Sequence, residues 1–367
     1  MNGLNTNTAA RMPRANELAA LMHPGRQSMV ITAVRQETPD MKTFRFEAAD
    51  GHELAYFQAG QYIPVYVEID GNVIERAYSL TSSPEASVQG YYEICVKRTG
   101  GGYVSNYIHE HFAVGQRVEL GAPAGFDHYV PLRDRDRLIG IAGGSGVTPF
   151  LSMARAIADG TLPVSLTLFY GCNTADELAF TGEWARLEAE TGGRFKCVPV
   201  VADPAADTAE HGFITLPLLQ KYADLGASTI FVSGPQGLMD HIRRTLAPLR
   251  LRRKFVRYCI HGDAQFAAVT GARERSFTLT VHQAGETYTV PARGDETVLR
   301  ALERAGLRPP VRCRSGACGF CRSCLVSGEF YVTGDNDGRR KRDKELGFIH
   351  PCCSFPESDM ELIVQRG

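Results

Sequence analysis

The sequence predicts a multidomain α+β protein with an antiparallel β-barrel, an α/β domain built on a parallel sheet, and a small C-terminal domain. Three observations lead to this fold class. Short strands of alternating polarity follow one another from residue 28 to about residue 130. Buried strands then alternate with helical stretches up to residue 257, which is the βαβ pattern of a parallel sheet. Finally, six of the ten cysteines lie between Cys313 and Cys353.

Length and composition are those of an ordinary globular protein. A chain of 367 residues has room for two or three domains of roughly 100–200 residues each. The formal net charge is -1, so the overall charge indicates neither nucleic acid nor a membrane as the main partner. No apolar run reaches the roughly 18–20 residues that span a bilayer, and the polar N-terminus lacks the apolar core of a secretory signal. We therefore expect a cytoplasmic protein.

The pattern divides the chain into a tail, the barrel, the parallel-sheet domain, a linker and the C-terminal domain, with bounds 1–27, 28–131, 132–257, 258–275 and 276–367. In the barrel, Asp70-Gly71 between two strand-like runs is a hairpin signal, because glycine accepts the positive φ of tight turns. The C-terminal domain opens with a hairpin at 277–292, and a helix at 295–306 precedes the cysteines.

The cysteine cluster has the spacing of an iron–sulfur site. Cys313, Cys318 and Cys321 fit C-x4-C-x2-C, the plant-type 2Fe–2S spacing, in which a fourth cysteine follows further on. Each iron needs two thiolates, and one tight loop supplies three of the four. Gly316 and Gly319 let backbone N–H groups approach the inorganic sulfurs. The main alternative is a structural zinc site, which usually pairs two C-x2-C knuckles, and the second knuckle is missing here.

The segment CRSGACGFCRSCLVSGEF at 313–330 and the downstream CCSFPESD resemble the ferredoxin module of multidomain reductases. The resemblance covers nearly the whole chain beyond the tail and implies a β-grasp, plant-type ferredoxin domain at 276–367. In that family the last cluster ligand stands four residues before a proline. This rule favours Cys352, four residues before Pro356, whereas spacing alone does not choose between Cys352 and Cys353.

One cysteine of the cluster, Cys324, is not a ligand in that family. A [4Fe–4S] cluster through Cys318, Cys321 and Cys324 would need the C-x3-C-P continuation, which the sequence lacks. The resemblance therefore implies a packed thiol at Cys324 and a cluster held by Cys313, Cys318, Cys321 and Cys352.

The segment RAYSLTSSP at 76–84 resembles the R-x-Y-[ST] flavin motif of the ferredoxin–NADP reductase superfamily. Arg76 can bind a phosphate through charge-assisted hydrogen bonds, and Tyr78 offers a ring face to the isoalloxazine. Ser79 can hydrogen-bond near N5, where hydride arrives. The resemblance assigns Arg76, Ala77, Tyr78 and Ser79 to the flavin, with Tyr78 and Ser79 at the reacting ring. Strand alternation puts Arg76 and Tyr78 on one face and Ser79 on the other, so the flavin must lie across a curved strand end.

A second segment, VKRTGGGYVSNYI at 96–108, looks like the other flavin motif of the family. Its glycines and a helix start near Ser105 would present N–H groups to a pyrophosphate. The residues implied are Lys97, Gly101, Gly102, Tyr103, Val104 and Ser105. Either motif alone fits an ordinary strand and turn, but both together, upstream of a nucleotide domain, favour a flavin. FAD is favoured because the S-N-Y continuation and GAPAGFD at 121–127 resemble flavohaemoglobins, although phthalate-dioxygenase-type reductases share the domain order and carry FMN.

The segment LIGIAGGSGVTPFLSMARAI at 138–157 is a strand, a glycine-rich turn and a helix. Thr148 suits the N-cap and Pro149 the first turn, and such a helix N-terminus binds diphosphate. The segment is not the Rossmann G-x-G-x-x-G, but it matches the GGxGxTP motif of the reductases. SGPQGLM at 233–239 matches their G-P motif beside the nicotinamide, where relatives often have Cys in place of Ser233. The residues implied are Gly143, Gly144, Gly146, Thr148, Pro149, Ser233, Gly234 and Pro235.

The choice of nicotinamide nucleotide depends on the residues after the second strand of this domain. Relatives that prefer NADPH hold its 2′-phosphate with Arg or Lys there. This sequence has YGCNTADE, with Asn173 where an Arg is common and with Asp176 and Glu177 nearby. A phosphomonoester would meet acidic side chains without a cationic fork, so we expect a preference for NADH.

Together the motifs predict an NADH-dependent reductase that passes electrons through FAD and its own 2Fe–2S cluster to a partner protein. The resemblance implies acceptors such as Rieske or di-iron oxygenases, an acyl-CoA epoxidase or a hybrid-cluster protein. The basic run from Arg339 to Arg342 is either a solvated loop or a docking patch for an acidic partner. Two alternatives stay open at this point: a reductase of a small acceptor such as a quinone, a ferric chelate or free flavin, and a redox-sensing or structural metal protein.

Overall fold

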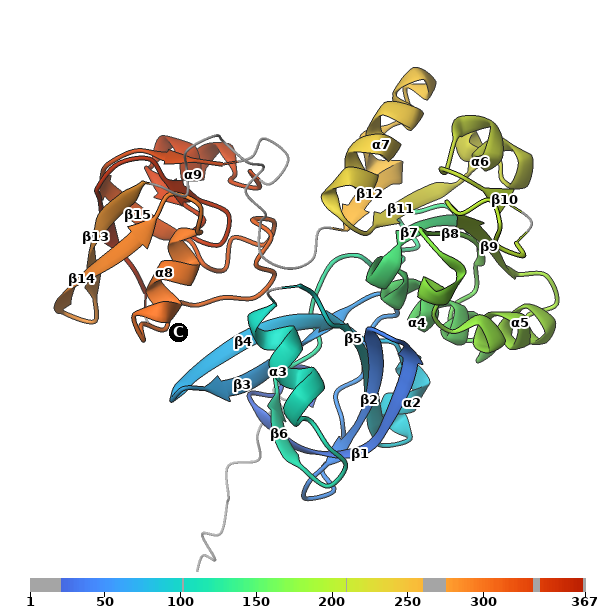
Figure 1. Cartoon of the computed structure of the whole chain (residues 1–367), viewed down its shortest axis with the longest axis horizontal. Coiled ribbons are helices and arrows are strands. Elements are labelled where there is room, and N and C mark those ends of the chain that lie inside the picture. The colour runs from blue at the N-terminus through green and yellow to red at the C-terminus, as the bar shows by residue number, and fades with distance from the viewer. Residues whose placement is uncertain (1–20, 101, 209, 260–274, 333–336, 366–367) are drawn as a thin grey trace, which may run out of the picture.

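The computed structural model describes residues 21–100, 102–208, 210–259, 275–332 and 337–365. It has three lobes (Figure 1), and the predicted fold class is confirmed: an antiparallel six-stranded sheet, a parallel six-stranded sheet, and a five-stranded sheet at the C-terminus. Most of the predicted tail and linker lies outside the described residues. Within them, no helix combines the length and the apolar character that a bilayer-spanning segment needs.

The first lobe is a closed barrel with strand order β4-β3-β6-β1-β2-β5 and antiparallel pairing throughout. A bridge between Leu80, just after β4, and Ile94 of β5 joins the two ends of the sheet. Both residues of the predicted hairpin turn, Asp70 and Gly71, have positive φ, at 51° and 76°. The elements are β1 (Gln27–Thr38), β2 (Met41–Ala48), β3 (Tyr62–Ile69), β4 (Asn72–Ser79), α2 (Pro84–Val88), β5 (Tyr91–Lys97), α3 (Tyr103–His111) and β6 (Arg117–Leu120).

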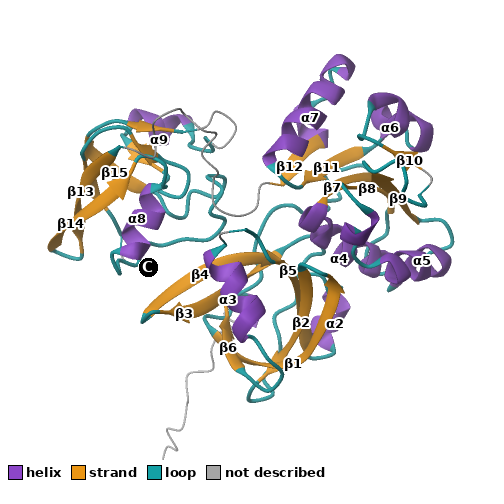
Figure 2. Ribbon diagram, in the orientation of Figure 1, coloured by secondary structure: helices purple, strands orange, loops and turns teal. Residues whose placement is uncertain are grey.

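The second lobe is a parallel sheet with strand order β10-β9-β8-β7-β11-β12. Helices α4 and α5 lie on one face of this sheet and α6 and α7 on the other, as Figure 2 shows, and their apolar residues pack against it. The strands are β7 (Arg137–Gly143), β8 (Ser165–Cys172), β9 (Phe195–Val201), β10 (Glu210–His211), β11 (Thr229–Ser233) and β12 (Val256–Cys259). The helices are η1 (Gly144–Val147), α4 (Thr148–Ala158), η2 (Ala175–Glu177), α5 (Thr181–Glu190), α6 (Leu216–Tyr222), η3 (Leu225–Ala227), α7 (Gln236–Leu246), η4 (Ala247–Leu249) and η5 (Arg253–Phe255).

The strand order of the second lobe reverses between β7 and β11. In open α/β sheets, ligands bind at the carboxyl ends of the strands beside such a switch point. Gly143 ends β7 and Ser233 ends β11, so both predicted nicotinamide motifs meet at this crevice.

The third lobe has strand order β14-β13-β19-β15-β17, with β13 and β19 parallel and the other pairs antiparallel. Helix α8 packs its apolar face on this sheet, and the Thr297 side chain caps its start by accepting from Arg300 N. The elements are β13 (Ser276–Gln283), β14 (Glu286–Arg293), α8 (Val298–Arg304), β15 (Ser323–Ser327), β16 (Phe330–Tyr331), α9 (Lys341–Glu345), β17 (Phe348–Ile349), β18 (Phe355–Pro356) and β19 (Met360–Ile363).

Candidate functional site

The predicted flavin strand is β4, and it ends beside both other lobes. Ser79 is buried and pairs with Tyr62 of β3, whereas Tyr78 packs against the barrel core. The Arg76 guanidinium lies 3.6 Å from the Glu303 carboxylate of α8, across the boundary with the C-terminal lobe. The arginine predicted to bind a flavin phosphate thus also contacts the cysteine-bearing lobe.

The second predicted flavin segment starts helix α3. Gly102 is its N-cap, and no side chain caps the helix, so N–H groups of its first turn can receive a phosphate. A Cβ on Gly102 would lie 2.3 Å from Ser105 Oγ and 2.7 Å from Thr99 Oγ1, so a larger residue here would require both hydroxyls to move. Tyr103 is 49% exposed at the start of the helix. Gly101 lies outside the described residues.

Two buried oxygens in or next to these segments have no hydrogen-bond partner among the described residues: Thr81 Oγ1, two residues after β4, and Asn106 Oδ1 of α3. Buried polar atoms are normally satisfied, so each is available to a polar ligand. Val104, in contrast, is 3% exposed in the barrel core, which leaves its backbone for any contact with a flavin. Ala77 pairs with Pro64 of β3.

At the switch point of the parallel sheet, the glycine-rich turn packs directly on the G-P motif. A Cβ on Gly146 would lie 2.2 Å from Ser233 O, and one on Gly143 would lie 2.8 Å from Leu238 Cδ2 and 3.2 Å from Pro235 Cδ. A Cβ on Gly234 would lie 3.0 Å from the Gly143 nitrogen. Only glycine permits this backbone-to-backbone approach, which forms the floor of the crevice.

The start of helix α4 differs from the prediction. Val147 is the N-cap, and Thr148 and Pro149 open the helix. The reason is the preceding turn: Gly144–Val147 is already a 3-10 helix that runs into α4, so the Thr148 hydroxyl donates back to Ser145 O at 3.0 Å. Among the described residues, no side chain caps the 3-10 turn or α4. The N-terminus of this continuous helix, which can receive a phosphate, therefore lies at the glycine-rich turn.

Two polar side chains lie at this crevice. The Ser233 side chain is fully buried, and its Oγ has no hydrogen-bond partner among the described residues. Lys97, at the end of β5, reaches the turn from the barrel: its Nζ lies 3.7 Å from the point where a Gly144 Cβ would be. Lys97 is held there by an ion pair with Asp40 at 3.1 Å. The barrel and the glycine turn therefore share one site.

The predicted cluster ligands come together in one loop and the turn that precedes β18. Cys321 Sγ lies 3.4 Å from Cys352 Sγ, and the Cys318 N–H donates to Cys313 Sγ at 3.4 Å. Gly316 has a φ of 80° and donates its N–H to Cys352 Sγ at 3.2 Å. Across the described residues, no group of Cys, His, Asp or Glu surrounds a single point as one metal ion requires; these four thiols instead lie in neighbouring pairs.

Hydrogen bonds among the four thiols divide their pKa values. Those from Cys318 and Cys352 hold the pKa of Cys313 well below its usual value, and one with Cys352 lowers the pKa of Cys321. The same contacts with Cys313 raise the pKa of Cys318 and of Cys352. Of the other two cysteines, Cys353 packs beside Cys352 and Cys321, whereas Cys324 lies outside that cluster. Cys324 is in β15, where its thiol points to Leu325 O at 3.9 Å, and the Cys353 thiol donates to His350 O at 3.4 Å.

An arginine in the cluster loop joins this loop to the flavin strand. Arg314 is 1% exposed and has a φ of 56°. Its guanidinium donates to both carboxylate oxygens of Glu303, at 2.6 and 2.8 Å, and to Glu75 O of β4 at 3.4 Å.

Burial raises the pKa of the Glu75 side chain to about 7, although Arg314 opposes this. Burial, and then the sulfurs of Cys313 and Cys318, also raise the pKa of Tyr62, which pairs with Ser79.

Comparison with known proteins accounts for all three lobes. An oxidoreductase FAD-binding domain family matches residues 28–129, an oxidoreductase NAD-binding domain family matches 141–244, and a 2Fe-2S iron-sulfur cluster binding domain family matches 281–357. The ferredoxin reductase component of 3-ketosteroid-9-alpha-monooxygenase from Mycobacterium tuberculosis is 31% identical over 350 residues, which cover 90% of this chain and 93% of that protein. The chain belongs to the three-domain flavin and iron–sulfur reductases.

Two further comparisons agree with this family. The glycine betaine monooxygenase reductase subunit of Chromohalobacter salexigens is 28% identical over 366 residues, which cover 92% of this chain and 95% of that protein. The structure of phthalate dioxygenase reductase, described as modular for electron transfer from pyridine nucleotides to [2Fe-2S], has a TM-score of 0.68 and 27% identity and covers 93% of this chain and 98% of that one. The predicted FAD, nicotinamide and 2Fe–2S domains are thereby confirmed, and the zinc alternative is not supported.

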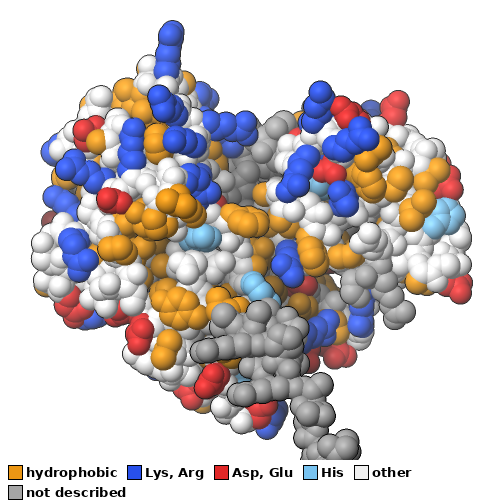
Figure 3. All heavy atoms as spheres, turned by 180° about the vertical axis from the view of Figure 1, so that it is seen from behind, with side chains coloured by type: hydrophobic (Ala, Val, Ile, Leu, Met, Phe, Trp, Pro, Cys, Tyr) orange, Lys and Arg blue, Asp and Glu red, His pale blue; other side chains and the backbone are white. Residues whose placement is uncertain are grey.

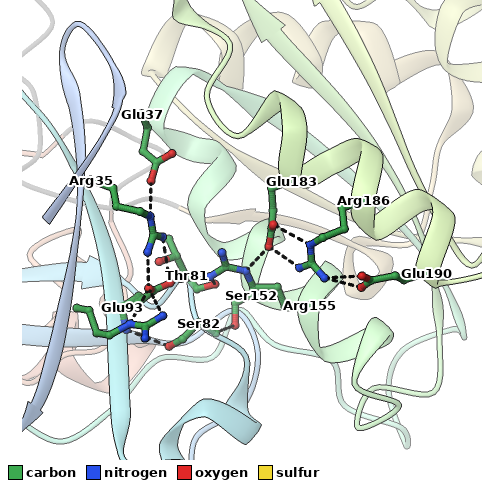
Figure 4. Close-up of polar contacts among 11 residues, drawn as sticks. Arg35, Glu37, Thr81, Ser82, Glu93, Ser152, Arg155, Glu183, Arg186 and Glu190 are labelled. Carbon is green, nitrogen blue, oxygen red and sulfur yellow. Dashed lines mark hydrogen bonds and ion pairs between the residues drawn. The ribbon is translucent and has the colours of Figure 1, made fainter. Parts of the chain in front are cut away.

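The two nucleotide domains of this reductase are joined by a charged network (Figure 4). Arg155 of α4 extends toward the barrel, where it pairs with the Glu93 carboxylate of β5 at 2.9 Å and donates to Thr81 O at 3.1 Å. On its other side it pairs with Glu183 of α5 at 2.9 Å. One turn earlier, the Ser152 hydroxyl donates to the Ser82 carbonyl at 2.7 Å. Helix α4 is thus bound to the residues that directly follow the flavin strand.

Glu93 is the centre of this network. Its side chain is 2% exposed and accepts from three arginines: Arg155, Arg35 and Arg45, each at 2.9–3.0 Å. Burial alone would raise its pKa, but the hydrogen bond from Arg35 and the charge of Arg155 lower the pKa of Glu93 to about 2. The carboxylate is therefore ionised at any physiological pH.

Sequence reasoning did not find this network or the Arg314 contact. A signal was present in both strand and helix. Glu93 interrupts the otherwise apolar run of β5, and Arg155 interrupts the apolar run 150–157 of α4. A charged residue inside an apolar run is buried only when it has a partner. Each of these two residues therefore indicates an opposite charge on another element.

Proposed function

We propose that this reductase transfers electrons from NADH, through FAD and a 2Fe–2S cluster that it binds, to the oxygenase component of a two-protein monooxygenase or demethylase, or to another metalloprotein. One arrangement carries the proposal: the glycine turn and the cluster loop contact the same barrel from two sides. Lys97 of the barrel reaches Gly144, and Arg314 of the cluster loop reaches Glu75 O. Nicotinamide, flavin and cluster can therefore be held in sequence by one chain.

The residues of the chain bind and orient the cofactors. No side chain has to act as an acid or a base in the hydride step. When bound, FAD accepts hydride from NADH and the cluster accepts single electrons. Ser79 and Tyr78 position the flavin ring on the barrel, and the buried Ser233 hydroxyl holds the nicotinamide at the crevice. Cys313, Cys318, Cys321 and Cys352 hold the cluster, and Arg314 keeps their loop against the flavin strand.

All ten cysteines are free thiols, which is typical of a reducing compartment. The cytoplasm is the compartment that we propose for this reductase. NADH is also the donor that the second nucleotide-binding strand favours, as the next prediction tests.

We predict a preference for NADH over NADPH of about tenfold or more in kcat/KM, equivalent to about 1.4 kcal/mol. Asn173 directly follows β8, and the Glu177 carboxylate accepts its N–H at 3.1 Å, so this acid lies where a 2′-phosphate would approach. Asp176 beside it is exposed. Steady-state kinetics with both nucleotides measure the ratio, and the Glu177→Gln variant should narrow it. A kcat/KM for NADPH equal to that for NADH would contradict the prediction.

The partner is expected to dock near the basic run 339–342. Arg339 is largely neutralised, because Asp337 pairs with it at 2.8 Å and its side chain is 16% exposed. The charges that remain for a partner are on helix α9: the Lys341 and Arg342 side chains are 92% and 76% exposed. Glu345 lies near both, so the patch is only moderately positive.

Charge reversal at Lys341 and Arg342 together is predicted to slow the reduction of an acidic acceptor protein several-fold at low salt, because steering by exposed charges acts on association. Succinylated cytochrome c, whose lysines carry carboxylates, is a suitable probe. Ferricyanide reduction by NADH should stay unchanged. The difference should vanish at high ionic strength; a rate that does not change at low salt would reject this docking site.

The whole relay is tested by an anaerobic NADH titration of the full chain, followed by UV–visible and low-temperature EPR spectroscopy. We expect the flavin band to bleach and a rhombic signal near g = 2 to appear. Bleaching without the signal, in protein that contains iron and sulfide in full, would contradict the transfer to the cluster. It would favour a reductase that serves a small acceptor from its flavin.

A further inference from the structure

A groove of about 740 Å³ separates the cluster loop from the nucleotide-binding domain. Ser315 and Ala317 of the cluster loop line one side, together with Gly338. Arginines from the end of α7 to β12, Arg250 and Arg253 among them, line the opposite side. Asp127, from the barrel domain, also lines it, so the groove is built from all three domains and has the cluster loop in its wall.

The groove carries unbalanced positive charge. The segment 243–254 contains six Lys or Arg and no Asp or Glu, and Figure 3 shows Lys and Arg side chains gathered over the lobe that carries α7. Of the four arginines in the wall, two have acidic neighbours: Arg257 pairs with Asp134, and Arg243 pairs with Asp240 at 3.0 Å. For the other two, Arg250 and Arg253, no acidic partner lies within ion-pairing distance in the described part of the chain.

The acids that line the groove do little to offset this charge. Asp337 is held by Arg339 at 2.8 Å and by Lys344 at 2.8 Å, and its hydrogen bond with Arg339 keeps its pKa far below the usual range. Asp127 is the other acid among the described lining residues. Four arginines therefore line the groove with two carboxylates, of which Asp337 is already paired, and Arg244, Arg252 and Lys254 are exposed nearby in the sequence.

The groove and the barrel strand β4 contact different residues of the cluster loop. The barrel contacts this loop at Arg314, which donates to Glu75 O. The groove is lined by the residues that flank Gly316, and the Gly316 N–H donates to Cys352 Sγ at 3.2 Å. A Cβ on Gly338 would lie 2.3 Å from Gly316 O, so this wall is packed directly on the loop. An occupant of the groove would approach the cluster loop at Ser315 and Ala317 and would leave the Arg314 contact with β4 in place.

We propose that this groove is the exit port of the reductase and receives an acidic projection of the acceptor protein. The proposal rests on the proposed function and adds a second contact surface, on the nucleotide-binding domain, to the patch on α9. Positive walls favour an acidic protein segment. Because the cluster loop forms part of the wall, an acceptor bound there lies next to the loop from which electrons leave the reductase. Each NADH then reduces two one-electron acceptors: NADH and two ferric haems yield NAD+, one proton and two ferrous haems.

The test uses the full-length holoenzyme with Arg250→Glu and Arg253→Glu combined, and with Arg250→Glu alone. Arg117→Glu is the matched control, because Arg117 is exposed on β6 of the barrel. Native cytochrome c, which is basic, and succinylated cytochrome c serve as two probes with one haem and opposite charge. At low ionic strength we expect the double variant to reduce the succinylated probe about tenfold more slowly and the native probe faster. Ferricyanide reduction should match that of the wild type.

The outcomes separate this proposal from the proposed function. If the Cys352→Ser protein reduces the succinylated probe as fast as the wild type does, electrons do not leave through the cluster and the proposed function fails. If the wild type depends on the cluster but the double variant behaves like Arg117→Glu with both probes, the groove is not the exit port. A loss of rate that persists at 1 M salt would likewise overturn it, since charge steering is screened there.

Discussion

Replacing Cys352 by serine is expected to abolish electron transfer beyond the flavin. The Cys352 side chain is 1% exposed, its sulfur lies 3.4 Å from Cys321 Sγ, and it accepts the Gly316 N–H. A serine hydroxyl stays protonated where a thiolate ligand is needed. We therefore expect the variant to lose its 2Fe–2S absorbance and EPR signal, and to reduce succinylated cytochrome c at least about 100-fold more slowly, a change of about 2.7 kcal/mol or more. NADH should still bleach the flavin in a stopped-flow experiment.

The matched control is Cys324→Ser. Cys324 lies in β15, and its thiol points to Leu325 O, so serine there should leave iron content and EPR signal intact. Cys353→Ser is a second control, because the Cys353 thiol points to His350 O. Loss of the cluster in Cys324→Ser and its retention in Cys352→Ser would reverse the assignment of the fourth ligand.

The parts of the site that the sequence predicts are those that depend on local backbone chemistry. A cluster loop needs cysteines at fixed spacing, and a phosphate-binding turn needs glycines where the backbone has positive φ or another chain segment passes. Gly146 illustrates this: a Cβ there would lie 2.2 Å from Ser233 O. Such requirements involve residues that are close together in the sequence, so the spacing of a motif is sufficient to predict them.

What the sequence did not predict depends on contacts between domains. Arg76 was expected to bind a phosphate alone, yet it lies 3.6 Å from Glu303, more than 200 residues further along the chain. Arg314 occupies one of the unspecified positions of the C-x4-C spacing, yet its side chain joins α8 to β4. The start of α4 was misplaced for a related reason, since the 3-10 turn that precedes Thr148 is shaped by the close approach of Ser233. No local pattern encodes these long-range partners.

Removing the Arg155 guanidinium is expected to slow hydride transfer from NADH to the flavin by about tenfold or more. Arg155 lies on α4, whose first turn faces the nicotinamide crevice, and it binds Glu93 and Thr81 O of the barrel. It therefore sets how the nicotinamide domain sits on the flavin domain. A small displacement of one ring against the other is costly, because a misplacement of about 1 Å can reduce a rate by about 100-fold.

The Arg155→Met variant keeps most of the side-chain volume and removes the charge. Stopped-flow bleaching of the flavin at saturating NADH should show the slower step, and a larger isotope effect with 4-deuterated NADH should accompany it. Arg155→Lys should recover part of the rate, since it keeps the charge but loses the forked geometry. Arg186→Met is the control: Arg186 binds the same Glu183 at the outer end of the network and is 49% exposed, so its loss should change little. Equal rates in Arg155→Met and Arg186→Met would refute the positioning role.

The same network should make this reductase sensitive to acid. The pKa of Glu93 is about 2 in the folded protein, against an ordinary value of 4.5. A carboxylate with a depressed pKa stabilises the fold above the unfolded-state value, and this contribution is lost as the pH falls from about 4.5 toward 2. The difference of about 2.5 corresponds to about 3 kcal/mol. In Glu93→Gln that part of the pH dependence should disappear, while the remaining arginines repel one another at every pH. The free energy of unfolding is measured between pH 4.5 and pH 2 in both proteins. If it falls equally in the variant and the wild type as the pH is lowered, Glu93 is not the group whose protonation destabilises the fold.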